Sequence, residues 1–150
     1  MIRRILTFLG AALVTYVLAA LLASNSALDS IVALGLPISL GQRLSANVHD
    51  LLGMATSFLP LVVIALLIAF LVASLAARRL PGLRLPLFAL AGAVAIVGIH
   101  VTLKLTFDIT PIAAARTAGG LLMQGAAGAV GAYLFARLQP PGVARSPDAS

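Results

Sequence analysis

The sequence predicts an all-α integral membrane bundle of four transmembrane helices, with a short amphipathic interfacial helix in the outer loop between the first two. The chain of 150 residues is 61% hydrophobic and only 9% charged, with a mean hydropathy of +1.13. Soluble domains are about a quarter charged, and a chain this short could not bury so many apolar side chains in its own core. Four separate apolar runs are also long enough to cross a bilayer, and arginines flank them.

The first apolar run covers residues 5–23 and follows Arg3 and Arg4. At 1.5 Å per residue it spans roughly 28 Å, close to the thickness of the hydrocarbon core. A cleavable signal peptide has a similar composition. The sequence Leu21-Leu22-Ala23 is a poor small-x-small cleavage site, however, so we expect the run to be retained as a helix.

The other three runs have recognisable boundaries. The second, residues 58–77, follows Ser57 as N-cap and ends at a pair of arginines, and the third covers residues 86–105 after a tight turn. The fourth ends at Leu138 and begins either at Pro111, with Thr110 as its cap, or at Ala118. Residues 1–138 thus form one transmembrane domain. Residues 139–150 contain three prolines without apolar periodicity, so we expect a disordered tail.

The distribution of basic residues predicts the orientation in the membrane. Short cytoplasmic loops of membrane proteins carry an excess of Lys and Arg. Seven arginines fall on one side of the predicted bundle, namely Arg3, Arg4, Arg78, Arg79, Arg84, Arg137 and Arg145, against Arg43, Lys104 and Arg116 on the other. We therefore expect both termini in the cytoplasm. Arginine outnumbers lysine nine to one, which favours a high-GC bacterium and hence its inner membrane.

The outer loop, residues 24–57, contains the predicted amphipathic helix. Ser39 and Gln42 have the spacing of a capping box, and Gly53 is a natural stop. Apolar residues recur at helical spacing, while polar residues lie away from that stripe. The apolar set is Leu40, Leu44, Val48, Leu51 and Leu52, and the polar set is Gln42, Arg43, Asn47, His49 and Asp50. This pattern is typical of a helix that lies at the membrane surface or caps the bundle.

Glycines line one face of the fourth helix. Steps of three and four residues place Arg116, Gly120, Gln124, Gly128 and Gly131 on one stripe. Small residues let a neighbouring helix approach closely, and a glutamine among them can form a hydrogen bond across the contact. Intramolecular packing is the first interpretation. A contact between copies of the chain and a ligand or ion path remain as alternatives.

The third helix carries His100, Lys104 and Asp108 at successive spacings of four. Lys104 and Asp108 lie near the outer boundary and can reach water. His100 lies deeper in the span, where an ionisable side chain either bonds to a carbonyl of a neighbouring helix or has a functional role. The short connection between the third and fourth helices makes them antiparallel neighbours. We therefore hypothesise an outer polar cluster of His100, Lys104, Asp108, Arg116 and Gln124, which His49 and Asp50 could approach. In this hypothesis Asp108 offsets the charges of Lys104 and Arg116.

Composition excludes several kinds of chemistry. The chain has no cysteine, which rules out thiolate catalysis, disulfide exchange and Cys-ligated metals, and it has no glutamate. His49, His100, Asp50 and Asp108 lack the spacing of a metal site, so we expect neither a metal nor a haem, and no cofactor. The basic residues sit at helix ends and form no stripe for nucleic acid.

Two classes of function remain after these exclusions. The preferred one is a non-catalytic accessory, scaffold or assembly subunit that contacts lipid and either another membrane protein or a second copy of itself. The alternative is a small transporter or channel that uses the outer polar cluster. An enzyme acting on lipid through a His–Asp pair is less favoured, and no residue is assigned a catalytic role.

Overall fold

The computed structural model describes residues 2–108 and 112–139, and the regular structure of these residues is entirely helical. Its elements are α1 (Ile2–Ala33), α2 (Leu40–Ala55), α3 (Phe58–Arg79), the 3-10 turn η1 (Pro81–Leu83), α4 (Arg84–Phe107), the 3-10 turn η2 (Ala113–Arg116) and α5 (Ala118–Leu138). The predicted all-α bundle of four long apolar helices with one short amphipathic helix is confirmed. The predicted disordered tail, residues 139–150, lies outside the described part of the chain except for Gln139.

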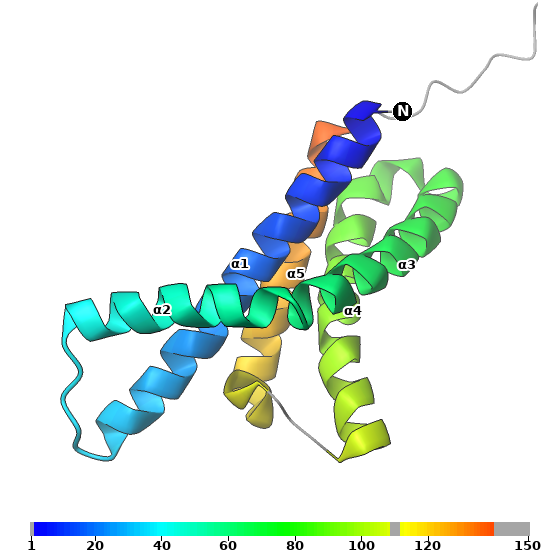
Figure 1. Ribbon diagram of the computed structural model, residues 1–150. Coiled ribbons are helices and arrows are strands. Elements are labelled where there is room, and N and C mark those ends of the chain that lie inside the picture. Colours follow the sequence, from blue (N-terminus) through cyan, green and yellow to red (C-terminus); the bar gives the residue numbers. More distant parts are fainter. Residues whose placement is uncertain (1, 109–111, 140–150) are drawn as a thin grey trace, which may run out of the picture.

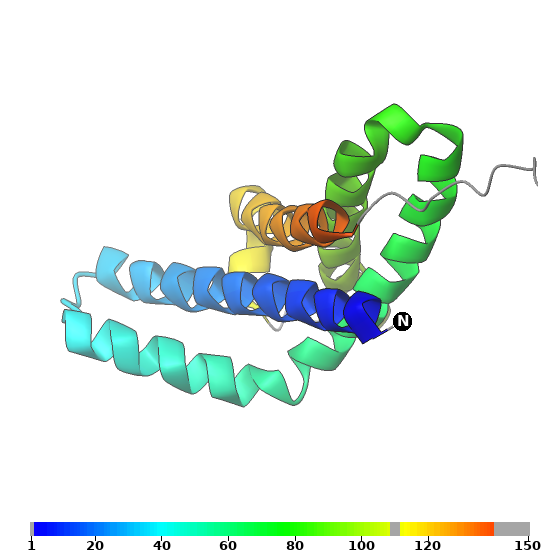
Figure 2. The same cartoon turned by 90° about the horizontal axis from the view of Figure 1, so that it is seen from above.

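The four long helices form a closed ring of pairwise contacts. α5 packs against both α1 and α4, α4 packs against α3, and α3 contacts α1. Seen from above, α5 lies between α1 and α4 (Figure 2). The short helix α2 crosses α1 and leads almost directly into α3 (Figure 1). Only Thr56 and Ser57 separate α2 from α3.

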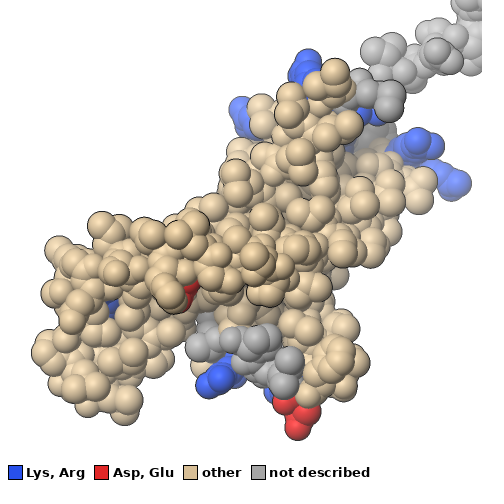
Figure 3. Space-filling view, viewed as in Figure 1, with Lys and Arg blue, Asp and Glu red and all other residues tan. Residues whose placement is uncertain are grey.

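All four long helices, α1, α3, α4 and α5, are long and apolar enough to cross a bilayer. Charged residues gather mainly at the two ends of the molecule, with a largely uncharged surface between them (Figure 3). We call the end that carries Arg3, Arg79 and Arg84 the arginine-rich end, and the end that carries Asp108 and Arg116 the opposite end. The chain is a multi-pass membrane protein, and lipid surrounds its apolar helices.

The first helix is longer than predicted. α1 continues ten residues beyond the expected end at Ala23 and reaches Ala33. The sequence suggested a stop because polar residues begin at Ser24. In the structure two of these residues have partners on α2. Asp29 forms an ion pair with Arg43 at 2.8 Å, and Asn47 accepts a hydrogen bond from Asn25 at 3.4 Å. The helix can therefore continue, and the predicted loop 24–57 is mostly helical.

The capping box at the start of α2 is confirmed. Ser39 Oγ accepts from the Gln42 N–H at 3.3 Å, and the Gln42 side chain accepts from the Ser39 N–H at 2.8 Å. The predicted stop at Gly53 is wrong, because α2 continues to Ala55. The assignment of faces also needs correction: Leu51 belongs to the side that packs on α1, where the Tyr16 hydroxyl donates to its carbonyl.

α2 has three distinct sides. Arg43, Asn47 and Leu51 contact α1. A second side, here called the apolar strip, consists of Leu40, Leu44, Val48 and Leu52, which are all exposed. Exposed polar residues (Gln42, Ser45 and His49) form the third side. An interfacial helix is expected to have this arrangement, with one side against the bundle, one apolar side and one polar side.

The remaining boundaries agree with prediction to within two residues. α3 starts at Phe58 as expected, although Ser57 makes no side-chain capping bond. α5 covers residues 118–138, which supports the later of the two predicted starts. Its N-cap is Thr117, whose hydroxyl accepts from the Gly120 N–H at 3.0 Å. The proposed cap Thr110 and first residue Pro111 lie outside the described residues.

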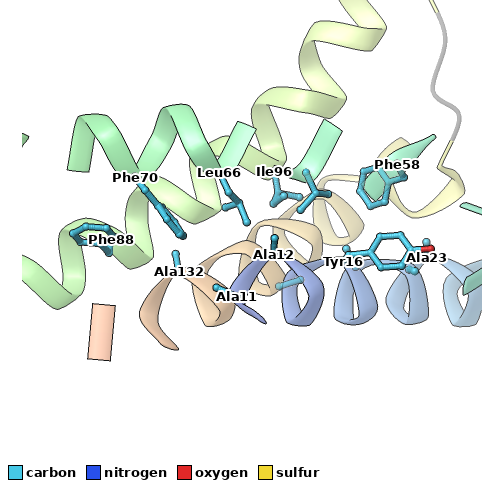
Figure 4. Close-up of a cluster of buried hydrophobic side chains, with 14 of the residues drawn as sticks. Ala11, Ala12, Tyr16, Ala23, Phe58, Leu66, Phe70, Phe88, Ile96 and Ala132 are labelled. Atoms are coloured by element: carbon cyan, nitrogen blue, oxygen red, sulfur yellow. The ribbon is translucent and has the colours of Figure 1, made fainter. Parts of the chain in front are cut away.

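The core is aromatic toward the arginine-rich end. Phe8, Phe70, Phe88 and Phe135 come from four different helices, and the rings of Phe70 and Phe135 stack at 4.5 Å. Figure 4 shows Phe70 and Phe88 at one end of the core and Phe58, Tyr16 and Ala23 at the other. Small residues, mainly alanines of α1 and α5, complete the core.

Candidate functional site

His100 lies on the buried face of α4. This face also carries Phe88, Gly92 and Ile96, each four residues apart. The imidazole is only 3% exposed, and its ring centroid lies 5.9 Å from that of Phe58. Neither ring nitrogen has a hydrogen-bond partner in residues 2–108 and 112–139. The sequence placed His100 below the end of the span, and the structure adds that it points into the bundle.

Gln124 of α5 is fully buried beside this histidine. Its Nε2 donates a hydrogen bond of 2.9 Å to the Ala19 carbonyl of α1, so the side chain joins two helices. The amide lies near the imidazole of His100, but Oε1 has no partner of good geometry. A buried acceptor without a partner typically costs about 1–3 kcal/mol. The pair His100 and Gln124 is therefore polar, buried and incompletely satisfied.

The other three members of the predicted outer cluster lie apart from this pair. Lys104, Asp108 and Arg116 are all exposed at the opposite end. In the part of the chain that the structure describes, the ion pair between Asp29 and Arg43 is the only one, so Asp108 does not contact either cation at ion-pair distance. Asp108 instead ends α4 in the left-handed conformation, with φ of 54°. Its backbone N–H donates to the Lys104 carbonyl.

His49 and Asp50 are neighbours in sequence but occupy different sides of α2. His49 is exposed on the polar side, whereas Asp50 is half-buried and lines a cavity. The cavity has a volume of about 500 Å³ and lies between α1, α2, α3 and α4. Residues from each of these helices line it, including Ser24, Asp50, Met54, Ser57, Phe58 and Leu103.

Ser24 is a polar residue of this cavity that the sequence analysis did not select. It is 3% exposed, and within the described part of the chain its Oγ has no hydrogen-bond partner. The Phe58 ring lines the cavity and also contacts His100, so the cavity and the buried polar pair share one wall. The available sign of a polar site was a serine directly after the first apolar run, but the sequence analysis places the end of the helix there.

The glycine stripe of α5 serves two neighbouring helices instead of one. A Cβ on Gly128 would lie 2.2 Å from the Gly92 carbonyl oxygen of α4. A Cβ on Gly131 would lie 1.9 Å from Thr15 Oγ1 of α1. Gly120 lies in the first turn, where it bonds to the cap Thr117. These contacts favour the intramolecular interpretation, and they identify Gly92 as the partner that the sequence analysis missed.

Two arginines hold the C-terminus of α5. Arg3 of α1 donates to the Leu138 carbonyl at 3.0 Å, and Arg84 of α4 donates to the Ala136 carbonyl at 2.7 Å. Cations at this position satisfy free carbonyls and oppose the negative end of the helix dipole. Positively charged residues that were selected as topology signals thus also have a structural role.

Among the described residues, no group of three or more His, Asp, Glu or Cys side chains could hold a metal ion. Comparison with known protein families, curated proteins and solved structures finds no match for this chain. The fold defines the class of this protein, which is a multi-pass membrane protein built as a four-helix bundle with an additional amphipathic helix.

Proposed function

We propose that this protein is a non-catalytic accessory, scaffold or assembly subunit of a bacterial inner membrane, with both termini in the cytoplasm. The partner is another membrane protein, which contacts the apolar strip of α2. The arginine count supports the orientation, and the arginine-rich composition supports the compartment.

The observation that carries this proposal is the arrangement of α2 on α1. The polar side chains Arg43 and Asn47 are directed to partners on α1, which fixes α2 at defined points along its length. Leu40 and Leu44 on the apolar strip are 85% and 67% exposed. A firmly held helix with an exposed apolar side next to a polar one presents a defined surface to a partner at the membrane interface.

Site-specific photo-crosslinking in native membranes tests the proposal. A photoreactive residue in place of Leu44 is expected to give one discrete protein adduct, because a specific partner covers that position. The same residue in place of Leu71 of α3, which is 61% exposed, is the control and should label lipid only. Adducts with lipid alone at both positions would refute the proposal. An adduct between two differently tagged copies would identify the partner as a second copy and overturn the heterologous interface.

The orientation is tested by reporter fusions. Fusions after residue 40, at the start of α2, and after residue 150 are expected to report opposite sides of the membrane, because an odd number of crossings separates them. A periplasm-active and a cytoplasm-active reporter at each position serve as mutual controls. Signals from the same side would contradict the four-crossing topology with cytoplasmic ends.

A small transporter or channel is the second candidate. The observation that favours it is the buried pair of His100 and Gln124, with three side-chain atoms that lack partners. A route from this pair to the arginine-rich end would have to cross the ring cluster of Phe8, Phe70, Phe88 and Phe135. Because these rings fill the core there, we rank transport below the accessory role.

A further inference from the structure

We infer that the cavity between α1, α2, α3 and α4 is a binding site for a small lipophilic cation, whose ammonium group is held by the Asp50 carboxylate. This inference concerns the side of α2 opposite to its exposed apolar strip, and it does not depend on the proposed partner. The cavity volume of about 500 Å³ lies within the range of small-molecule sites in proteins.

The charge of the cavity calls for a cation. Among the described residues that line it, Asp50 alone is charged. No Lys, Arg or His among the described residues forms an ion pair with this carboxylate. Its neighbours in the cavity are mainly apolar, such as Met54, Leu61 and Leu103. A carboxylate in such surroundings is stabilised by a cation that comes close to it and displaces water.

A second polar group points to the same ligand. Ser24 lines the cavity from α1 and is almost fully buried, yet its hydroxyl oxygen has no partner among the described residues. A hydroxyl oxygen can accept an N–H hydrogen bond. Ser57 supplies another hydroxyl, whose hydrogen is directed to the Met54 carbonyl, so its oxygen can also accept. One carboxylate and two hydroxyl oxygens form an acceptor set that suits an ammonium group.

The rest of the wall suits the apolar body of the ligand. Phe58 lines the cavity, and its ring centroid lies 5.9 Å from that of His100. An aromatic face attracts cations, and the effect is larger where water is excluded. Leu61 and Leu103 add aliphatic surface. A strongly hydrated inorganic cation would find few oxygen ligands here, whereas an organic ammonium can use the apolar wall.

Such an ammonium group has two sources in a bacterial membrane, a free lipophilic amine and the amine headgroup of a phospholipid. The first arm of the test uses the full chain in a neutral detergent and follows its thermal unfolding midpoint with benzylammonium, which carries three N–H donors. Ethylbenzene, which has the same shape without the charge, is the control probe. The second arm compares nanodiscs of phosphatidylethanolamine with nanodiscs of phosphatidylglycerol, which lacks the amine.

We expect benzylammonium, but not ethylbenzene, to raise the midpoint in a saturable way. Asp50→Asn should weaken the apparent affinity about tenfold, since a hydrogen-bonded charge pair is lost, and Ser24→Ala should weaken it less. Asp108→Asn removes the same charge at an exposed position outside the cavity and should bind like the parent. Stabilisation only in phosphatidylethanolamine, again dependent on Asp50, would assign the ligand to the lipid headgroup.

Ala27→Leu provides a second variant that keeps the carboxylate. Ala27 lines the cavity, so the larger side chain should fill part of it and block the cation even if Asp50→Asn does not fold. Equal stabilisation by the cation and its neutral analogue would overturn the proposal. So would undiminished binding in both Asp50→Asn and Ala27→Leu, or the absence of stabilisation in both arms.

Discussion

Replacing Gly128 with leucine is expected to lower the free energy of unfolding by about 3 kcal/mol, because the new side chain enters a contact between two backbones. The Cβ alone would lie 2.2 Å from the Gly92 carbonyl oxygen and 2.6 Å from Ile96 Cγ1. A backbone atom cannot rotate away as a side chain can. α4 and α5 would therefore have to separate, and both helices would lose contacts along their length.

The measurement is the thermal unfolding midpoint in detergent, compared with Gly98→Leu. Gly98 lies in α4, the helix that Gly128 of α5 contacts, but a Cβ there would meet none of the described residues within 4 Å. The control therefore adds the same side chain to the same bundle without a clash, and we expect it to unfold close to the parent. Equal losses in the two variants would mean that the close approach of α4 and α5 at Gly128 does not exist.

Three of the long helices could be predicted from the sequence because charged residues mark their ends. Arg78 and Arg79 end α3, and Arg84 begins α4. A charged side chain at the end of an apolar run can be recognised from the neighbouring residues in the sequence alone. The end of α1 was missed because its continuation depends on α2. Asp29 is tolerated within the helix since Arg43, fourteen residues further on, pairs with it.

Periodicity predicted which residues share a face, but not which helix the face meets. Gly128 and Gly131 are three residues apart and fall on one stripe, yet Gly128 contacts α4 and Gly131 contacts α1. A helix that lies between two others divides a stripe between them, as α5 does in Figure 2. The same reasoning explains why Gly92 was missed, since its importance arises only from the helix opposite.

The sequence indicated only some members of the candidate site. The depth of His100 in its span selected it as an ionisable group within the membrane, and the structure places it on the buried face of α4. Four-residue spacing grouped His100 with Lys104 and Asp108, which the structure leaves exposed. The cavity could not be predicted, because its polar residues Ser24 and Asp50 lie on different helices. Their proximity is a property of the packed bundle.

The second large effect concerns the ring cluster near the arginine-rich end. Phe70 of α3 is 4% exposed and contacts three other rings: Phe8 at 5.8 Å, Phe88 at 5.5 Å and Phe135 at 4.5 Å. These contacts connect α3 to three helices at once. Phe70→Ala would leave a cavity between them, and large-to-small changes of this kind cost about 3–5 kcal/mol in protein cores.

We expect Phe70→Ala to fall near the lower end of that range, about 3 kcal/mol. Lipid already surrounds apolar groups in a bilayer, so the loss consists of packing contacts and not of transfer from water. The control is Leu71→Ala, one residue further along α3, where the side chain is 61% exposed and meets lipid. Its effect should stay within about 0.5 kcal/mol. Phe70→Leu, which refills part of the space, should lie between them. The measurement is again the unfolding midpoint of purified protein in one detergent. Equal unfolding midpoints for Phe70→Ala and Leu71→Ala would mean that Phe70 does not hold α3 in the bundle. The ring cluster would then no longer support ranking transport below the accessory role.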